Sequence, residues 1–251
     1  MTTPAAPLTT DLGPLLFARY AYPPNVLGYC GPEDHRALLE HAAAGVGGRG
    51  LRELARGFEG AWPYLQLIAE SAGLSDPLDR RVVEAYWVGG RLLDRVDAAA
   101  LCRFVEDRFR AYAGPRLPKV TAAALRGAVP HHNFHVFCVS PWVGLLRSGR
   151  VEEPLRVLDN CRIRWGKVLS VDGGTAMVSS RRLKWDGGRI RLGAPSAERA
   201  VVATDGLSAG PVPEPGDVVA LHWDQVCDRL DGRRLAALRY HTRRAMAAAA
   251  A

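Results

Sequence analysis

The apolar residues of this chain change their spacing near residue 158, and the change predicts two kinds of structure. Up to that point they recur every three or four positions, which is the period of an α-helix. Within 97–114, for example, Leu101, Phe104 and Val105 would share one helix face. Residues 13–158 are therefore predicted to form an all-α domain of about six or seven helices.

Several residues mark where these helices begin and end. Pro63 and Pro141 interrupt apolar runs, and each predicts a kink or a break between two helices. Asp76 is expected to cap the helix that follows it. Residues 1–12 are expected to form a flexible tail, and the alanines at 247–251 a second one.

From Cys161 onward the pattern becomes one of alternation. Cys161, Ile163 and Trp165 alternate with Arg162 and Arg164, so the two sets would point to opposite faces of a strand. A strand beginning at Cys161 is therefore predicted, with the arginines on the side opposite the thiol.

Short strands and tight turns fill the rest of this part. Asp-Gly-Gly forms the predicted tip of two hairpins, at 168–178 and 183–192. A short strand is expected at 199–203 and another at 216–223, after a Pro/Gly loop. Residues 159–246 are thus predicted to be a small β-barrel of OB or SH3 type with a closing C-terminal helix, which makes the whole fold α+β.

The composition adds limits to this picture. The chain has 251 residues, 48% of them hydrophobic and 24% charged, as is usual for a globular protein. No signal peptide and no run of about 18 apolar residues is visible, so no membrane partner is expected. The five cysteines are odd in number and scattered, which favours a reducing, cytoplasmic location.

The net charge of +7 leaves two interpretations open. Trp165 and Trp185 lie among arginines, and such a barrel could bind single-stranded nucleic acid by stacking and charge. Alternatively, the tryptophans belong to the core and the arginines are simply solvated. The second interpretation is favoured, so nucleic acid is not the expected partner.

A series of motifs follows Cys161 in a fixed order. Gly-x-Val stands at 166–168, Val-Asp-Gly at 171–173, Ala-x-Val at 176–178 and Gly-Asp-x-Val-x-x-His at 216–222. The order, with the cysteine first and His222 late, resembles the HypC/HupF family of [NiFe]-hydrogenase assembly chaperones.

The resemblance implies a function for two of these residues. Such chaperones carry an iron that bears cyanide and carbon monoxide from a scaffold protein to the hydrogenase large subunit. Cys161 would then be a thiolate ligand and the contact to the scaffold, and His222 a second ligand or an orienting group. A soft, low-spin iron suits thiolate and imidazole. Arg162 and Arg164 would favour the thiolate and contribute to partner binding.

A second set of possible ligands lies in the helical part, in the stretch HHNFHVFC. On a helix, His131, His135 and Cys138 would share one face, which is a possible zinc or iron site. His132 would instead act as a cap. A metal-dependent enzyme is therefore the alternative function, although no HExxH motif, P-loop or GxSxG is present and a binding protein is the main expectation.

A rigid turn near the beginning of the chain also carries reactive side chains. It contains Tyr20, Tyr22, Tyr29, Cys30 and His35, which could line a pocket or simply pack over helices. The surrounding stretch FARYAYPPNVLGYCGP, with EAYWVG and HNFHVFCVSPWVGLLR, is similar to an uncharacterised bacterial family associated with hydrogenase genes.

Overall fold

The structure of the protein is a computed structural model that describes residues 12–250. The predicted tail at 1–12 lies outside the described residues, except that Leu12 begins the first helix. The helices that precede the sheet are α1 (Leu12–Val26), α2 (His35–Ala44), α3 (Arg49–Arg56), α4 (Trp62–Ser71), α5 (Arg80–Trp87), η1 (Arg91–Arg95), α6 (Ala98–Ala113), η2 (Gly114–Arg116), α7 (Leu117–Leu125), α8 (His132–Phe134), η3 (His135–Val139), α9 (Trp142–Arg147) and α10 (Glu152–Cys161).

The local signals explain most of these boundaries. Pro63 is in the first turn of α4, where its missing N–H costs nothing, and α3 and α4 are separate helices as predicted. The predicted cap at Asp76 is wrong, because Asp79 precedes α5 and accepts a hydrogen bond from Arg81 N. Asp76 instead pairs with Arg52, at 2.9 Å between Oδ2 and Nη2.

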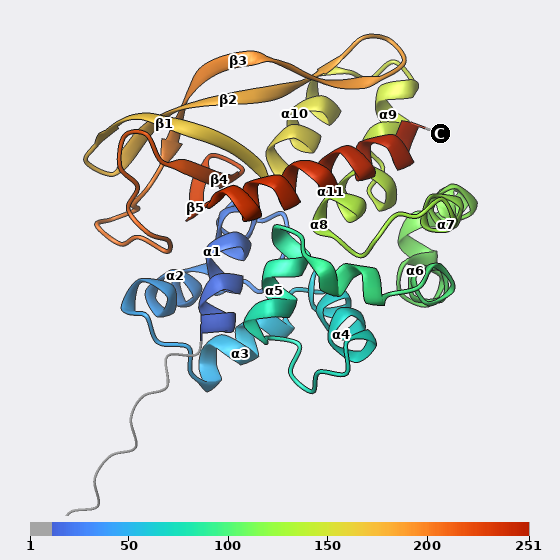
Figure 1. Ribbon diagram of the computed structural model, residues 1–251, viewed down its shortest axis with the longest axis horizontal. Coiled ribbons are helices and arrows are strands. Elements are labelled where there is room, and N and C mark those ends of the chain that lie inside the picture. Colours follow the sequence, from blue (N-terminus) through green and yellow to red (C-terminus); the bar gives the residue numbers. More distant parts are fainter. Residues whose placement is uncertain (1–11, 251) are drawn as a thin grey trace, which may run out of the picture.

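Five strands form one sheet, in the order β1-β2-β3-β5-β4, and it closes on itself because β1 pairs with both β2 and β4 (Figure 1). Both predicted Asp-Gly-Gly turns join neighbouring strands. The predicted strand at 199–203 is instead largely part of the long β3, and residues 225–229, for which no strand is predicted, form β5. The strands are β1 (Arg164–Asp172), β2 (Thr175–Trp185), β3 (Ile190–Val201), β4 (Val218–His222) and β5 (Gln225–Arg229).

The junction between the two parts differs from the predicted strand. Cys161 is the last residue of α10, and β1 begins only at Arg164. Arg162 and Arg164 are each 1% exposed, as buried as Ile163, whereas Trp165 is only half-buried. The expected alternation is therefore wrong, because the chain turns out of a helix here and both arginines point inward.

The last helix, α11 (Gly232–Ala250), crosses the molecule between the sheet and the helices of the first half (Figure 1). It contacts α7, α8 and η3, and it includes residues 247–250, which were expected to form a loose tail. Because these alanines lie against Arg126 and Arg147, whose guanidinium groups donate to their carbonyls, the helix continues.

One apolar core extends through both parts of the chain. Ile163, Ala220 and Cys227 belong to the same buried cluster as Phe17 and Tyr20 of α1. A smaller cluster fills the interior of the sheet, and its members are Val168, Ala176, Val178, Ala200, Val202, Val219, Leu221 and Val226. The predicted domain boundary at 158/159 falls inside α10. This helix continues to Cys161, and only Arg162 and Ile163 separate it from β1.

Candidate metal centre

Three side chains from distant parts of the sequence meet where the helices contact the sheet. They are His132 at the start of α8, Cys161 at the end of α10 and His222 at the end of β4. One potential ligand atom from each lies within 4.8 Å of the others. Among residues 12–250, this is the one group of three or more such side chains that is compact enough to hold a metal ion.

The hydrogen bonds of His222 leave one ring nitrogen free. Its Nδ1 lies 2.6 Å from the carbonyl oxygen of Tyr20, and a carbonyl only accepts, so Nδ1 carries the proton. Nε2 is then unprotonated, and it is buried without a hydrogen-bond partner among the described residues. Burial lowers the pKa of His222 to about 4. A neutral ring with a free, buried lone pair is what a metal requires of histidine.

His132 is oriented in the same way. Its Nε2 donates to the carbonyl oxygen of Cys161 at 2.8 Å, which leaves the lone pair on Nδ1. That atom lies 3.3 Å from the Tyr86 hydroxyl, a long contact. Burial and the neighbouring His222 ring keep the pKa of His132 well below its usual value. Backbone carbonyls that fix the ring in this manner are typical second partners of metal-binding histidines.

The Cys161 thiol is not activated by the neighbouring arginines. Burial raises the pKa of this thiol. Arg162 and Arg164 do not offset the effect, because their guanidinium groups pair with Asp159 and Glu198. The expectation that these arginines would favour the thiolate and contact a partner is therefore wrong. A metal ion must itself displace the thiol proton.

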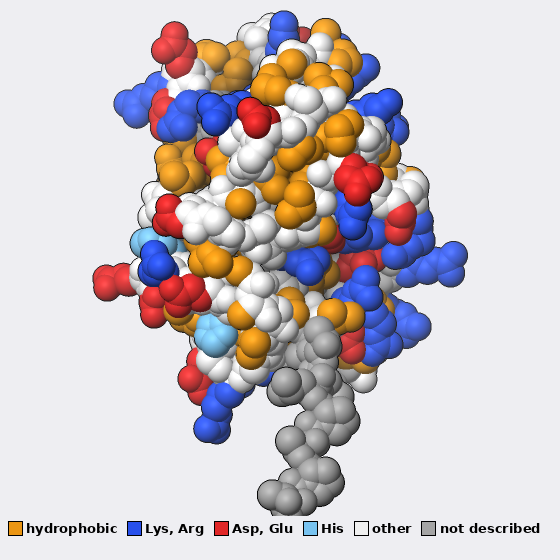
Figure 2. Space-filling model, turned by 90° about the vertical axis from the view of Figure 1, so that its left-hand side faces the viewer, with side chains coloured by type: hydrophobic (Ala, Val, Ile, Leu, Met, Phe, Trp, Pro, Cys, Tyr) orange, Lys and Arg blue, Asp and Glu red, His pale blue; other side chains and the backbone are white. Residues whose placement is uncertain are grey.

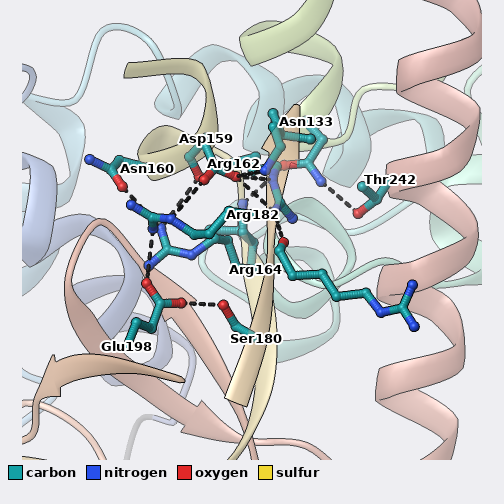
Figure 3. Close-up of polar contacts among 12 residues, drawn as sticks. Asn133, Asp159, Asn160, Arg162, Arg164, Ser180, Arg182, Glu198 and Thr242 are labelled. Carbon is teal, nitrogen blue, oxygen red and sulfur yellow. Dashed lines mark hydrogen bonds and ion pairs between the residues drawn. The ribbon is translucent and has the colours of Figure 1, made fainter. Parts of the chain in front are cut away.

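The ion pairs of these buried arginines connect α10 to the sheet (Figure 3). Arg162 pairs with Asp159 at 2.8 Å, and Arg182 of β2 reaches the other oxygen of that carboxylate at 3.0 Å. Arg164 and Arg182 both pair with Glu198 of β3. A buried charge that lost its partner would cost several kcal/mol, so the network fixes the end of α10, where Cys161 lies.

Hydrogen bonds connect the chain segments that carry the three candidate ligands. The backbone N–H of Trp223 donates to Asn160 O at 2.7 Å, which joins the neighbour of His222 to the neighbour of Cys161. The Asn133 side chain accepts from Ile163 N at 3.1 Å and donates to Thr242 Oγ1 at 2.9 Å (Figure 3). The ligands are therefore held in place before any metal binds.

A cavity of about 140 Å³ adjoins the three ligands. Tyr29 and Cys30, from the turn singled out in the sequence, line it, whereas Tyr20 is buried in the core and stacks on Trp87. The remaining lining is mostly aromatic or small: Pro24, Phe58, Gly60, Ala61, Tyr86, Trp87, Tyr112, His135, Ser140, Trp142, Val157 and Trp223.

The alternative site at His131, His135 and Cys138 is not assembled. Residues 135–139 form a π-helix, η3, so the expected spacing on one face is lost. His131, not His132, caps α8 by accepting from Asn133 N, and its ring stacks on His241. His135 contacts the Tyr64 hydroxyl, and Cys138 lies 3.9 Å from Ala245 O.

His132 is the member of this cluster that the sequence analysis missed. Its position next to His131 gives no sign of metal binding, because the other two ligands come from α10 and β4. Only the packing of α8 against these two elements brings His132 to Cys161 and His222. No spacing rule along the chain could have found it.

The fold and this cluster define an α+β protein with a buried centre of two histidines and one cysteine. The chain belongs to the family described as "Family of unknown function (DUF6390)", whose model matches residues 9–251. Searches of curated proteins and of solved structures find no match. Among the described residues, no helix is both long enough and apolar enough to span a bilayer.

Proposed function

We propose that this protein is an accessory protein of [NiFe]-hydrogenase assembly that binds an iron ion through His132, Cys161 and His222. One observation carries the proposal: the residues that the HypC resemblance singles out, Cys161 and His222, have ligand atoms within 4.8 Å of each other. The resemblance itself concerns short motifs, and this proximity is independent of it.

The chemistry of the ligand set is suited to such a cargo. Thiolate and imidazole favour a soft, low-spin iron over Mg²⁺ or Ca²⁺. Three protein ligands leave coordination positions for small groups that the iron brings with it, and the cavity of about 140 Å³ is the space for them. Both histidines are neutral, so each offers a lone pair at physiological pH.

The partner, a hydrogenase large subunit or an assembly scaffold, would approach through the mouth of this cavity. The exposed residues of its lining are Tyr29, Cys30 and Tyr112. Arg162 and Arg164 are too deeply buried to touch a partner. Figure 2 shows one face of the molecule, where acidic and basic side chains are mixed around an apolar and neutral middle, and this face offers no basic stripe for nucleic acid.

The proposal is tested by purifying the tagged protein from cells that express the hydrogenase, beside its Cys161→Ala and Cys102→Ala variants. Partners are identified by mass spectrometry. We expect the large subunit or the scaffold to be enriched with the wild type and with Cys102→Ala, whose thiol lies outside the cavity. With Cys161→Ala, neither the large subunit nor the scaffold should be enriched. Equal enrichment with all three forms, or no hydrogenase-related partner, would contradict the proposal.

A further inference from the structure

A second thiol lies at the entrance of the same cavity. Cys30 belongs to the turn between α1 and α2 and lines the cavity together with Cys161. The residue as a whole is exposed, yet burial raises the pKa of its thiol to about 12. Because Cys30 lines the cavity and its thiol is buried, we infer that its sulfur points into the cavity and its backbone faces solvent.

The turn that presents Cys30 is rigid. The buried Asn25 side chain donates to Cys30 O at 2.8 Å and to Pro32 O at 2.7 Å. Gly31 has a φ of 91°, and a Cβ there would lie 2.4 Å from the Phe58 ring, so only glycine fits. The Asn25 side chain therefore fixes the position of Cys30 in the turn.

The turn is also fastened to the metal-binding side. The Tyr29 ring stacks on Trp223, with 4.1 Å between ring centroids. Trp223 follows His222 directly and has a left-handed backbone, with a φ of 54°. Such a conformation costs a non-glycine residue free energy, and it is retained here where the chain must turn sharply after the ligand. Cys30 follows Tyr29 and Trp223 follows His222, so the stacked rings connect the Cys30 turn to the end of the His222 strand.

The three-residue centre is one ligand short of the usual tetrahedral site. Zn²⁺, Co²⁺ and Fe²⁺ in sites with cysteine and histidine ligands commonly take four ligands, and two of each is a standard set. Cys30 lies outside the compact group of three, so its sulfur must move closer to the other ligands to reach a metal there. His222 lines the cavity, and its Nε2 is buried without a hydrogen-bond partner among residues 12–250, which independently points to a ligand there.

We propose that Cys30 is the fourth ligand of a divalent transition metal bound by His132, Cys161 and His222, and the ligand nearest to solvent. This inference rests on the metal binding that the proposed function assigns to the other three residues. Binding of one M²⁺ releases the two thiol protons and changes no oxidation state. As the outermost ligand, Cys30 is the one that a partner's ligand would replace during transfer.

The test uses Co²⁺ as the probe, added anaerobically to saturation to the full-length protein. Sulfur-to-cobalt charge-transfer absorption grows with the number of thiolates bound, so it counts them. Wild type, Cys30→Ser, Cys161→Ser and Cys102→Ser are compared. Cys102 is a matched control because its thiol contacts Thr121 O, away from the cavity. Cys30 is exposed, so its serine variant should fold normally, which circular dichroism verifies.

We expect the charge-transfer absorption of Cys30→Ser and of Cys161→Ser to be about half that of the wild type, and Cys102→Ser to equal the wild type. Full intensity in Cys30→Ser would overturn the inference and leave the three-ligand centre intact. If the wild type binds no cobalt at all, the metal centre of the proposed function fails as well. The two failures are therefore distinguishable in one experiment.

Discussion

Two backbone carbonyls, those of Tyr20 and Cys161, fix the tautomers of the two histidines. Each carbonyl accepts a hydrogen bond from one ring N–H, which leaves the other nitrogen of that ring with its lone pair. Cys161 and His222 could be predicted from the sequence by resemblance. The tautomers could not, because they depend on carbonyls that only the folded chain brings into place.

Replacing His222 by asparagine separates the ligand role from the packing role. The asparagine amide can take the place of Nδ1 and keep the donation to Tyr20 O, whereas the Nε2 lone pair is lost. We expect metal affinity to fall by at least a factor of ten. The free energy of unfolding should fall by less than about 2 kcal/mol, because the hydrogen bond is retained.

Isothermal titration with Zn²⁺ and urea unfolding measure the two quantities. His241→Asn is the control, since His241 is also buried but lies outside the centre. Equal affinities in wild type and His222→Asn would exclude His222 as a ligand.

Among the elements, those with a clear period were predicted well and those fixed by tertiary contacts were not. The apolar face of α6 and both Asp-Gly-Gly hairpins follow from local pattern. β5 has three consecutive buried residues, Val226, Cys227 and Asp228, and therefore shows no alternation. The prediction that Arg162 and Arg164 are exposed on a strand fails for a related reason. Residues up to Cys161 belong to α10, so the predicted strand does not begin there.

The short helix α8 depends on the Asn133 side chain, which connects it to the β1 segment and α11. In Asn133→Ala, the buried N–H of Ile163 loses its acceptor and the bond to Thr242 is lost. We expect the free energy of unfolding to fall by roughly 2–4 kcal/mol and metal affinity to fall with it. Urea denaturation measures the first quantity. Thr242→Val should cost less, because the Asn133–Ile163 bond survives, and a smaller effect of Asn133→Ala than of Thr242→Val would contradict this role.

At the scale of the whole molecule, one core contains residues of both halves together with several neutral histidines. Burial lowers the pKa of His135, His222 and His241 to about 4, and those of His131 and His132 well below the usual value. Below about pH 6.5 the unfolded chain takes up protons that the folded chain excludes. Stability is therefore complete above that pH and declines as the pH falls toward 4.

This predicts a lower urea midpoint at pH 5.5 than at pH 7.5. Each such histidine lowers the free energy of unfolding by about 1.4 kcal/mol in total between these two pH values. His135→Phe removes one titrating group among aromatic neighbours, so its stability should decline less steeply with falling pH than that of the wild type. A midpoint that does not change between the two pH values would show that the histidines are not buried as neutral groups.

The central claim is that His132, Cys161 and His222 bind one metal ion together. X-ray absorption at the zinc edge of the Zn²⁺-loaded protein tests it most directly. We predict zinc–sulfur distances of about 2.3 Å and zinc–nitrogen distances to imidazole of about 2.0–2.1 Å, with a smaller sulfur contribution in Cys161→Ala. A shell of oxygen atoms without sulfur, or the same spectrum in Cys161→Ala, would contradict it.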